Sequence, residues 1–517
     1  MRRVGRWIMA TAGFVLALPA GANAAVDGAR SLGDPLLPQL GNGGYDVDSY
    51  RLDLDYDPVA NEFNSARTTM DATASAKLRE FSFDFQDLDV SSVRVDGRAA
   101  DFSQVEATPD LSDNPDVTQP MKLVVEPDPS TRPKPGRDFT VVVRYAGEPQ
   151  VITDPDTSIE GWIPACYPLD PPPGEEQTCD GAFVVNEPMG TNGWFPSNNY
   201  PTDKATFDTH ITVPDGKTAL GVGELASRTP NPDGTVTWHW SEDDPTATYL
   251  TTATVGDFIY SEESMTENST GRTLPVYNAI DASATPEQQA AINASLAEAP
   301  GQINFLSDTY GAYPFDSTGA VADRASGVGY ALEVQTKPHY SGGFSSGNPS
   351  INIGTQLHEL AHQWWGNSAT LQQWSDIWFN EGWANWSEYH WDFVENGAPS
   401  TAEIFDDRYA NTPDEEWEVA PAVLDGDPAN LFHFFPTYER GAMTIEGYRQ
   451  IVGDDTFYEF ARGMLQEYAY GNVSTEEFIE EAKAASGFSG AELELLDDYF
   501  QQWLYGETKP TILPEDF

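Results

Sequence analysis

The sequence predicts an α+β protein in which an antiparallel, β-sandwich-like domain is followed by a mainly helical domain. From Tyr45 to about Phe258, apolar and polar residues alternate in segments such as YDVDSYRLDLDY, FTVVVRYAG and TVTWHW, with the period of a half-buried strand. From about Thr285 onward, segments such as TPEQQAAINASLAEAPG and STEEFIEEAKAASG have the residue pattern of helices. We therefore expect a β domain over residues 40–265 and a helical domain over residues 266–517.

Local signals mark the ends of these elements. Asp-Gly pairs at 96–97 and 233–234 favour tight turns between strands. Thr285 precedes Pro286, an N-cap followed by proline at the first helical position. Ser474 and Glu477 have the spacing of a capping box. These signals predict helices that begin at about 286 and 475.

The N-terminus is typical of an export signal. Arg2, Arg3 and Arg6 precede the apolar run WIMATAGFVLALPAG, and Ala22-Asn23-Ala24 supplies the small residues that a signal peptidase needs. We expect a signal peptide over residues 1–24, a secreted or periplasmic product, and no stable membrane insertion after cleavage. An uncleaved membrane anchor is the alternative, although the apolar run is short for a span of roughly 20 residues. The general and twin-arginine export routes both stay open.

Composition excludes one class of partner. The chain has 517 residues, with 27 Lys and Arg against 82 Asp and Glu, for a net charge of −55. Because phosphates would be repelled, we expect no binding to nucleic acid. The acidity serves either solubility in salty surroundings or attraction of cationic ligands. The two cysteines, Cys166 and Cys179, are expected to form a disulfide in an oxidising compartment, with metal binding as the alternative.

The segment HELAHQWWGN, residues 358–367, carries the strongest functional signal. Residues four apart share one face of an α-helix, so His358 and His362 can offer two imidazole nitrogens to one zinc ion. Glu359, displaced around the helix, can instead hydrogen-bond a water molecule on that ion. With only seven histidines in the chain, a chance match on a structural helix is the weaker interpretation.

A catalytic zinc site needs a third protein ligand and an open position for water. The candidate is Glu381 in DIWFNEGWANW, which 18 residues separate from His362. That interval lets the first helix end near Gly366 and a second helix return to the metal. Two neutral imidazoles and one carboxylate would keep the bound water acidic. Glu388 falls on the same face as Glu381 and could accept a hydrogen bond from a ligand histidine, or be a solvated or packing side chain.

These residues resemble the zinc aminopeptidase family that includes aminopeptidase N and the leukotriene-forming epoxide hydrolase. HELAHQWWGN followed after 18 residues by NEG matches its metal motif, and YDVDSYRLDLDYDP and the segment from Phe195 to Asp208 resemble its N-terminal domain. The resemblance implies a thermolysin-like fold for the helical domain and one zinc ion per chain. It ends near QQWLYGETKP, which implies the compact two-domain form.

The resemblance also implies roles for three further residues. Ala331-Leu332-Glu333-Val334 aligns with the family's Ala-Met-Glu-Asn motif, so Glu333 would bind the free α-ammonium group of a peptide. Glu187, in Val185-Asn186-Glu187, would be a second anchor, although Val185 stands where glutamine is usual. Tyr438, in YERG, would donate its hydroxyl to the oxyanion.

The expected function is that of an exported zinc metallo-aminopeptidase acting on peptides with a free N-terminus through a zinc-activated water. Glu359 would take a proton from that water and pass it to the leaving amine. A thermolysin-like endopeptidase that uses the same zinc site but not Glu333 is the first alternative. A non-catalytic peptide-binding or adhesion protein is the second, and retention of Glu359 speaks against it. The preferred N-terminal residue and the oligomeric state are left open.

Overall fold

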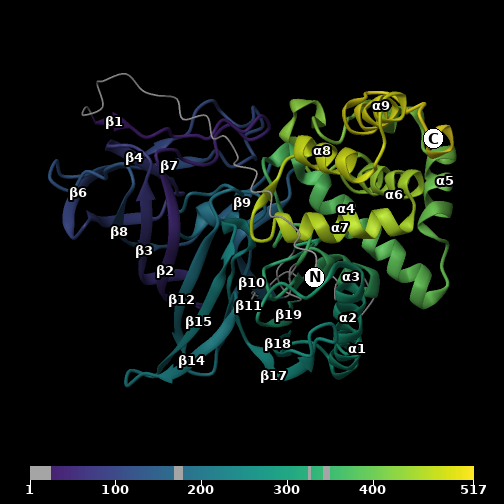
Figure 1. Ribbon diagram of the computed structural model, residues 1–517. Coiled ribbons are helices and arrows are strands. Elements are labelled where there is room, and N and C mark those ends of the chain that lie inside the picture. Colours follow the sequence, from purple (N-terminus) through teal and green to yellow (C-terminus); the bar gives the residue numbers. More distant parts are fainter. Residues whose placement is uncertain (1–24, 168–177, 324–327, 342–349) are drawn as a thin grey trace, which may run out of the picture.

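The computed structural model describes residues 25–167, 178–323, 328–341 and 350–517. The predicted signal peptide, residues 1–24, lies outside the described residues. Strands occupy the first half of the chain and helices most of the second half, on opposite sides of the molecule in Figure 1. This order confirms the predicted α+β class.

The largest sheet belongs to the N-terminal half. Its strand order in the described chain is β1 (Val26–Asp27), β4 (Leu78–Asp84), β7 (Met121–Glu126), β6 (Arg98–Glu106), β5 (Asp89–Val95), β8 (Arg137–Gly147), β3 (Glu62–Ala74), β2 (Tyr45–Asp57), β12 (Ala205–Pro214), β15 (Thr235–Thr246) and β14 (Glu224–Pro230). Neighbours are antiparallel except β1 with β4 and β2 with β12. Burial alternates along β12, as the period-two pattern predicts.

A second sheet completes the sandwich-like arrangement. It has the order β13 (Thr218–Gly221), β16 (Ala253–Gly256), β11 (Thr178–Val185), β10 (Ile159–Tyr167) and β9 (Val151–Thr153). Its side chains share one core with the large sheet. Trp162 of β10 lies edge-on to Tyr56 and Phe63, with ring centroids 4.9 Å and 4.8 Å apart. Cys166 and Cys179 are register partners of β10 and β11 and form the predicted disulfide.

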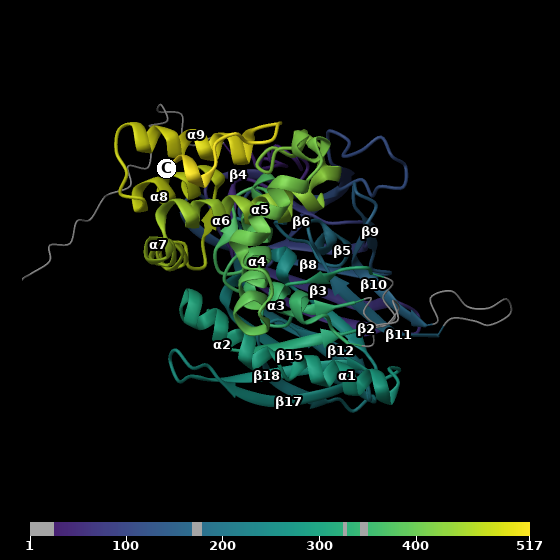
Figure 2. The same cartoon turned by 90° about the vertical axis from the view of Figure 1, so that its right-hand side faces the viewer.

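A third sheet lies beside the first helices in Figure 2. Its order is β17 (Phe258–Thr266), β18 (Thr273–Asp281), β19 (Thr318–Ala322), β21 (His339–Tyr340) and β20 (Ala331–Leu332). β17 pairs along its whole length with β18, so the strand before the predicted boundary at 265/266 joins the sheet that follows it. The boundary itself stays a prediction. This sheet matters for function because β20 leads directly into Glu333.

The C-terminal half is built from α1 (Pro286–Leu296), α2 (Ala299–Tyr310), α3 (Ile353–Ala361), α4 (Ile377–Trp391), α5 (Thr401–Asn411), α6 (Gly441–Val452), α7 (Asp454–Glu467), α8 (Thr475–Ala485) and α9 (Ala491–Tyr505), with the short strands β22 (Thr370–Leu371) and β23 (Asn472–Val473). The predicted caps are confirmed, because Thr285 and Ser474 both form capping boxes. Aromatic rings fill the core, and Trp365 stacks on Trp383 with centroids 4.0 Å apart. No helix among the described residues combines the length and apolar character needed to cross a bilayer.

The two halves meet through an apolar cluster and a buried lysine. The cluster joins side chains such as Leu250 of the β half to Trp374 and Ile377 at the start of α4. Lys204, just before β12, donates to the carbonyls of Asn367, Ser368 and Gly471 at 3.0 Å each. The β domain thereby supports the loop that follows α3.

Candidate metal centre

Two antiparallel helices bring the candidate zinc ligands together. α3 begins after Asn352, whose side chain accepts a hydrogen bond from the Thr355 amide and caps the helix. His358 lies in the last turn of α3 and His362 at its C-cap, so both rings leave the same side of the helix. α4 returns alongside α3 and carries Glu381 in its second turn.

The three ligand atoms converge. Glu381 Oε2 lies 3.0 Å from His358 Nε2 and 3.4 Å from His362 Nε2. His362 Nδ1 lies 2.9 Å from the Trp365 carbonyl oxygen. Because a carbonyl only accepts hydrogen bonds, Nδ1 donates there and the lone pair of Nε2 is left for a metal in the neutral ring.

Two glycines permit this packing. Gly366 has a φ of +131°, and a Cβ at this position would lie 3.1 Å from His362 Nδ1. A Cβ on Gly382, next to Glu381, would lie 2.8 Å from the backbone of Gly441 in α6. Larger side chains at either position would move a ligand or the helix that carries it.

The carboxylate and imidazoles form an ion pair in the metal-free chain. Burial disfavours charge on both rings, but the Glu381 carboxylate outweighs it and raises the pKa of both histidines, to about 10 for His362. Burial raises the pKa of Glu381, but the two imidazoles prevail and bring it to about 2. Protons therefore hold the place that a metal cation would take.

We expect zinc binding to be coupled to proton release. His362 carries a proton below about pH 10 in the metal-free protein, so zinc must displace it at neutral pH and zinc affinity should fall as the pH is lowered. Calorimetric titration of the metal-free protein at pH 7, in two buffers of different ionisation enthalpy, measures the protons released. Identical heats in both buffers would contradict this coupling.

The donor set fits zinc. Two imidazole nitrogens and one carboxylate oxygen, all within 4.8 Å of one another, are the ligands of catalytic zinc sites that keep a fourth position open. Glu388 also lies close, with Oε2 3.9 Å from His358 Nδ1. That separation is an ion-pair distance and too long for the hydrogen bond suggested by the sequence.

A cavity of about 360 Å³ opens in front of these ligands. It is lined by the candidate ligands and by Glu359, Glu333, Glu187, Tyr438, Asp156, Ser158, Tyr330, Ala331, Leu332, Thr355, Asn385, Glu388, Phe432 and Phe434. Burial raises the pKa of Glu359 to about 8, although the imidazoles of His358 and His362 lower it. All the residues proposed from sequence for metal, catalysis or substrate binding therefore face one cavity.

Two carboxyl groups in this cavity each have one oxygen without a hydrogen-bond partner among the described residues. Glu333 is 2% and Glu187 is 7% exposed, and Oε1 of each is buried without a hydrogen-bond partner among the described residues. Burial raises the pKa of both, and their mutual repulsion adds to this for Glu187. Buried acids are normally paired, so these two oxygens are exceptions within the described residues.

The backbone of Glu333 is held from α3 and the loop after it. Its carbonyl accepts hydrogen bonds from Gln363 Nε2 at 3.1 Å and from Asn367 Nδ2 at 2.7 Å. Both donors belong to the HELAHQWWGN segment. The metal ligands and Glu333 therefore share one rigid support.

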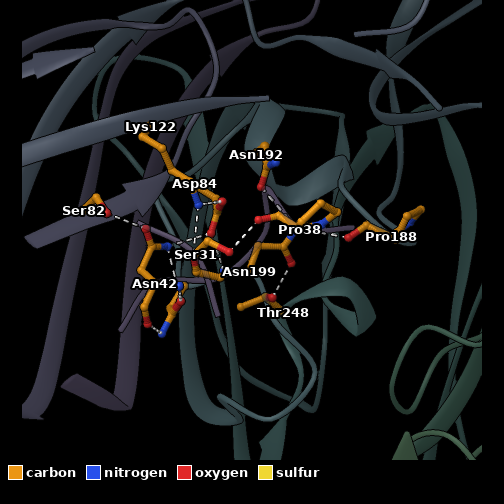
Figure 3. Close-up of polar contacts among 12 residues, drawn as sticks. Ser31, Pro38, Asn42, Ser82, Asp84, Lys122, Pro188, Asn192, Asn199 and Thr248 are labelled. Atoms are coloured by element: carbon orange, nitrogen blue, oxygen red, sulfur yellow. Dashed lines mark hydrogen bonds and ion pairs between the residues drawn. The ribbon is translucent and has the colours of Figure 1, made fainter. Parts of the chain in front are cut away.

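A buried polar network reaches Pro188, the residue after Glu187 (Figure 3). Asn199 Nδ2 donates to the carbonyl of Pro188 at 3.0 Å, and the Asn199 amide donates to Asp84 Oδ2 at 3.1 Å. Asp84 Oδ1 pairs with Lys122 Nζ at 2.6 Å, and both side chains are almost fully buried. This network fixes the turn that presents Glu187 to the cavity.

Tyr438 reaches the cavity from an element other than α3 and α4. It lies in the π-helical turn Phe435–Arg440, a conformation frequently found at functional sites. Its ring centroid is 6.1 Å from that of His358. Glu439 beside it accepts from Tyr389 Oη at 2.6 Å and from Arg408 Nε at 2.8 Å. Burial and the cavity carboxylates raise the pKa of Tyr438 well above its usual value, so the hydroxyl keeps its proton.

Most of the other residues that line the cavity were not predicted from the sequence. Asp156 and Ser158 come from the turn between β9 and β10, and Phe432 and Phe434 precede the π-helical turn. None of these residues belongs to a motif with a recognisable spacing. Asn385, one turn after Glu381 on α4, and Thr355, one turn before His358 on α3, were detectable from helical periodicity.

Comparisons with known proteins agree with this geometry. The model of the peptidase M1 N-terminal domain matches residues 46–250, and the model of the peptidase family M1 domain matches residues 348–503. Aminopeptidase M1-C of Oryza sativa subsp. japonica is 27% identical over 355 residues, which are 65% of this chain and 38% of that protein. Endoplasmic reticulum aminopeptidase 1 of Homo sapiens is 25% identical over 358 residues, or 66% and 36%. The chain thus spans less than half the length of these relatives.

Solved structures extend the likeness to nearly the whole chain. An M1 zinc metallopeptidase from Deinococcus radiodurans has a TM-score of 0.73 and 25% identity, covering 93% of this chain and 99% of that one. A mutant two-domain M1 zinc metallopeptidase bound to L-arginine has a TM-score of 0.75 and 24% identity, with the same coverage.

These comparisons confirm the predicted family, the predicted order of domains and, for the family, zinc as the cofactor. The two matched segments follow one another in the chain and together include more than half of its 517 residues. The chain belongs to peptidase family M1.

Proposed function

We propose that this chain is a zinc metallo-aminopeptidase that hydrolyses the first peptide bond of peptides with a free N-terminus. The observation that carries this proposal is the pair of buried carboxyl groups of Glu187 and Glu333. Each has one oxygen without a hydrogen-bond partner among the described residues, and both line the cavity that contains the candidate metal ligands. An α-ammonium group is the cation that a peptide brings into such a place. Family membership supports the same activity.

The roles of the chain's own residues follow from their places in the cavity. Zinc held by His358, His362 and Glu381 supplies Lewis-acid polarisation of a carbonyl group and acidification of a water molecule. Glu359 accepts the proton of the attacking water and delivers it to the leaving amine. Its buried position favours this shuttle, because a carboxyl group with a pKa near neutrality both accepts and returns a proton readily.

Selection of the first bond is assigned to the two anchoring acids. Glu333 and Glu187 hold the α-ammonium at a fixed place relative to the metal ligands, so the first carbonyl group of the peptide reaches the reacting position. Tyr438 donates its hydroxyl to the carbonyl oxygen as negative charge develops there. An internal segment of a longer peptide has no ammonium group to offer, and its entry would leave both acids unpaired.

Replacing Glu333 by glutamine should lower kcat/KM for free peptides by about 100-fold. The substitution keeps the size of the side chain but leaves the buried ammonium without its main counter-charge, and a broken buried ion pair costs about 3 kcal/mol. Steady-state rates on an aminoacyl p-nitroanilide measure the effect. Glu298→Gln, which changes an exposed acid at the start of α2, is the matched control and should leave kcat/KM unchanged. A Glu333→Gln enzyme with wild-type kcat/KM would remove Glu333 from the ammonium site.

Export through the N-terminal segment is part of the proposal. The disulfide between Cys166 and Cys179 supports it, because disulfides persist in oxidising compartments. Mass spectrometry of protein secreted by, or released from the periplasm of, an expressing bacterium should give a mature N-terminus at Ala25. Retention of residues 1–24 in the exported protein would favour the anchor instead.

Product analysis tests the proposed activity directly. A decapeptide incubated with the zinc-loaded protein should yield a ladder that shortens from its N-terminus, one residue at a time, in mass spectra taken over time. Internal fragments appearing at the earliest times would show an endopeptidase using the same zinc site. Absence of any cleavage by the zinc-loaded protein would leave a peptide-binding role.

A further inference from the structure

A second group of metal-ligating side chains lies on the large sheet, in the β half of the molecule (Figure 1). His210 of β12 and His239 of β15 are direct cross-strand partners. Asp208 stands two residues before His210 and therefore on the same, less buried face of β12. The two imidazole rings stack with centroids 3.9 Å apart and planes 14° apart.

The ligand atoms of these residues lie close together without forming hydrogen bonds. Asp208 Oδ1 lies 2.6 Å from His210 Nε2 and 2.9 Å from His239 Nε2. All three atoms are shielded from solvent, and none has a hydrogen-bond partner among the described residues. A hydrogen bond at these distances requires the N–H bond of the ring to point at the carboxylate oxygen. The three ligand atoms lie within 4.8 Å of one another, and rotation of the stacked rings would bring both imidazole nitrogens to one ion.

The donor set equals that of the candidate metal centre. Each site presents two imidazole Nε2 atoms and one carboxylate oxygen within 4.8 Å of one another. Among the residues that the structure describes, three groupings of possible metal-ligating side chains occur, and the other two share the cavity at α3. This sheet site is thus the one grouping of the described chain that the proposed peptidase activity does not use.

The two arginines near this site are paired with another carboxylate, that of Asp53. Arg51 on the neighbouring strand β2 is engaged by Asp53, with Nη2 2.9 Å from Oδ1, and it faces the other oxygen of Asp208 at 3.4 Å. Arg67 of β3 also pairs with Asp53. An ordinary ion pair between Asp208 and one protonated ring is the competing explanation, and metal titration distinguishes the two.

We propose that Asp208, His210 and His239 bind one divalent transition-metal ion of the zinc or copper(II) class. Imidazole ligands favour these ions over Mg²⁺ and Ca²⁺, which prefer oxygen. Asp208 is 43% exposed along its side chain, so an ion can reach the site from the surface. The ion joins β12 to β15 next to the edge strand β14 and acts as a structural clip.

Copper(II) titration of the full-length, zinc-loaded protein tests this site. We expect one Cu²⁺ per chain to bind beyond the zinc already present, with an electron paramagnetic resonance spectrum split by two nitrogen ligands. His239→Val and Asp208→Asn should each weaken this binding by at least about tenfold, since loss of even an indirect partner of a metal typically costs about 10- to 100-fold.

Thr212→Val is the matched control. Thr212 and its cross-strand partner Thr237 form the next pair along the same face of β12 and β15, so this variant keeps all three ligands and should keep the copper site. Peptide hydrolysis by each variant should stay at the wild-type level and shows that the chain is folded. Equal copper binding by His239→Val and wild type, a spectrum without nitrogen splitting, or no binding beyond one metal per chain would overturn the proposal.

Zinc protection against heat provides a second, independent readout. A ligand that binds only the folded state stabilises it by an amount that grows with the logarithm of its concentration above Kd, so added zinc should raise the Tm of the zinc-loaded wild type and of Thr212→Val. The same addition should leave the Tm of His239→Val unchanged. An equal rise in all three proteins would mean that the clip does not involve these ligands.

Discussion

A Glu359→Gln enzyme should lose between about 100-fold and 10,000-fold in kcat, the usual contribution of a general acid–base group. The amide keeps the size of the side chain but accepts no proton from the attacking water. Glu359 is not one of the three side chains of the candidate metal centre, which are His358, His362 and Glu381. The metal content should therefore stay at one zinc per chain, measured by inductively coupled plasma mass spectrometry on the same sample used for kinetics.

Two outcomes of that experiment would distinguish a catalytic role of Glu359 from a structural one. A loss of activity together with a loss of zinc would mean that Glu359 supports metal binding, and the proton-transfer role would then be without support. Retention of more than a tenth of the wild-type kcat with full zinc occupancy would contradict the role outright. KM should change little, because the amide still occupies the same place in the cavity.

Replacing Tyr438 by phenylalanine should lower kcat by about 100- to 1000-fold, as for other single oxyanion donors. The hydroxyl is the only group removed, and the phenyl ring can keep its place beside the rings of His358 and Phe434. Because the hydroxyl acts on charge that develops during the reaction, KM should change far less than kcat. Steady-state kinetics of the two enzymes on one aminoacyl substrate measure both constants.

Tyr389→Phe is the control for that variant. It removes a hydroxyl that hydrogen-bonds Glu439, next to Tyr438, but leaves the Tyr438 hydroxyl in place. We expect a much smaller effect on kcat. If Tyr438→Phe instead raised KM and left kcat unchanged, the tyrosine would be a substrate-binding group without a part in the chemistry.

The three metal ligands were predictable from the sequence, because their spacing follows local rules of helix geometry. The four-residue spacing of His358 and His362 places them on one helical face, and the interval to Glu381 leaves room for one loop and one returning helix. The caps at Thr285 and Ser474 follow from equally local chemistry. The position of Glu333 came instead from a family resemblance, since nothing in GYALEVQ itself indicates a substrate contact.

Other features required the tertiary structure. The hydrogen bonds from Gln363 and Asn367 to the Glu333 carbonyl, and the network from Lys122 to Pro188, join segments far apart in the chain. His210 and His239 become neighbours only through the register of β12 and β15, and a shift of one residue would send one of them to the other face. Register depends on the whole sheet, so short motifs do not reveal it.

The central claim is that Glu187 and Glu333 select a free N-terminus beside the metal centre. The most direct test compares kcat/KM of the zinc-loaded wild-type protein on one peptide with a free N-terminus and on the same peptide N-acetylated. We predict rapid loss of the first residue from the free peptide and a kcat/KM at least about 100-fold lower for the blocked one, since acetylation removes the charge that the two acids bind. Equal cleavage of the two peptides would contradict the account.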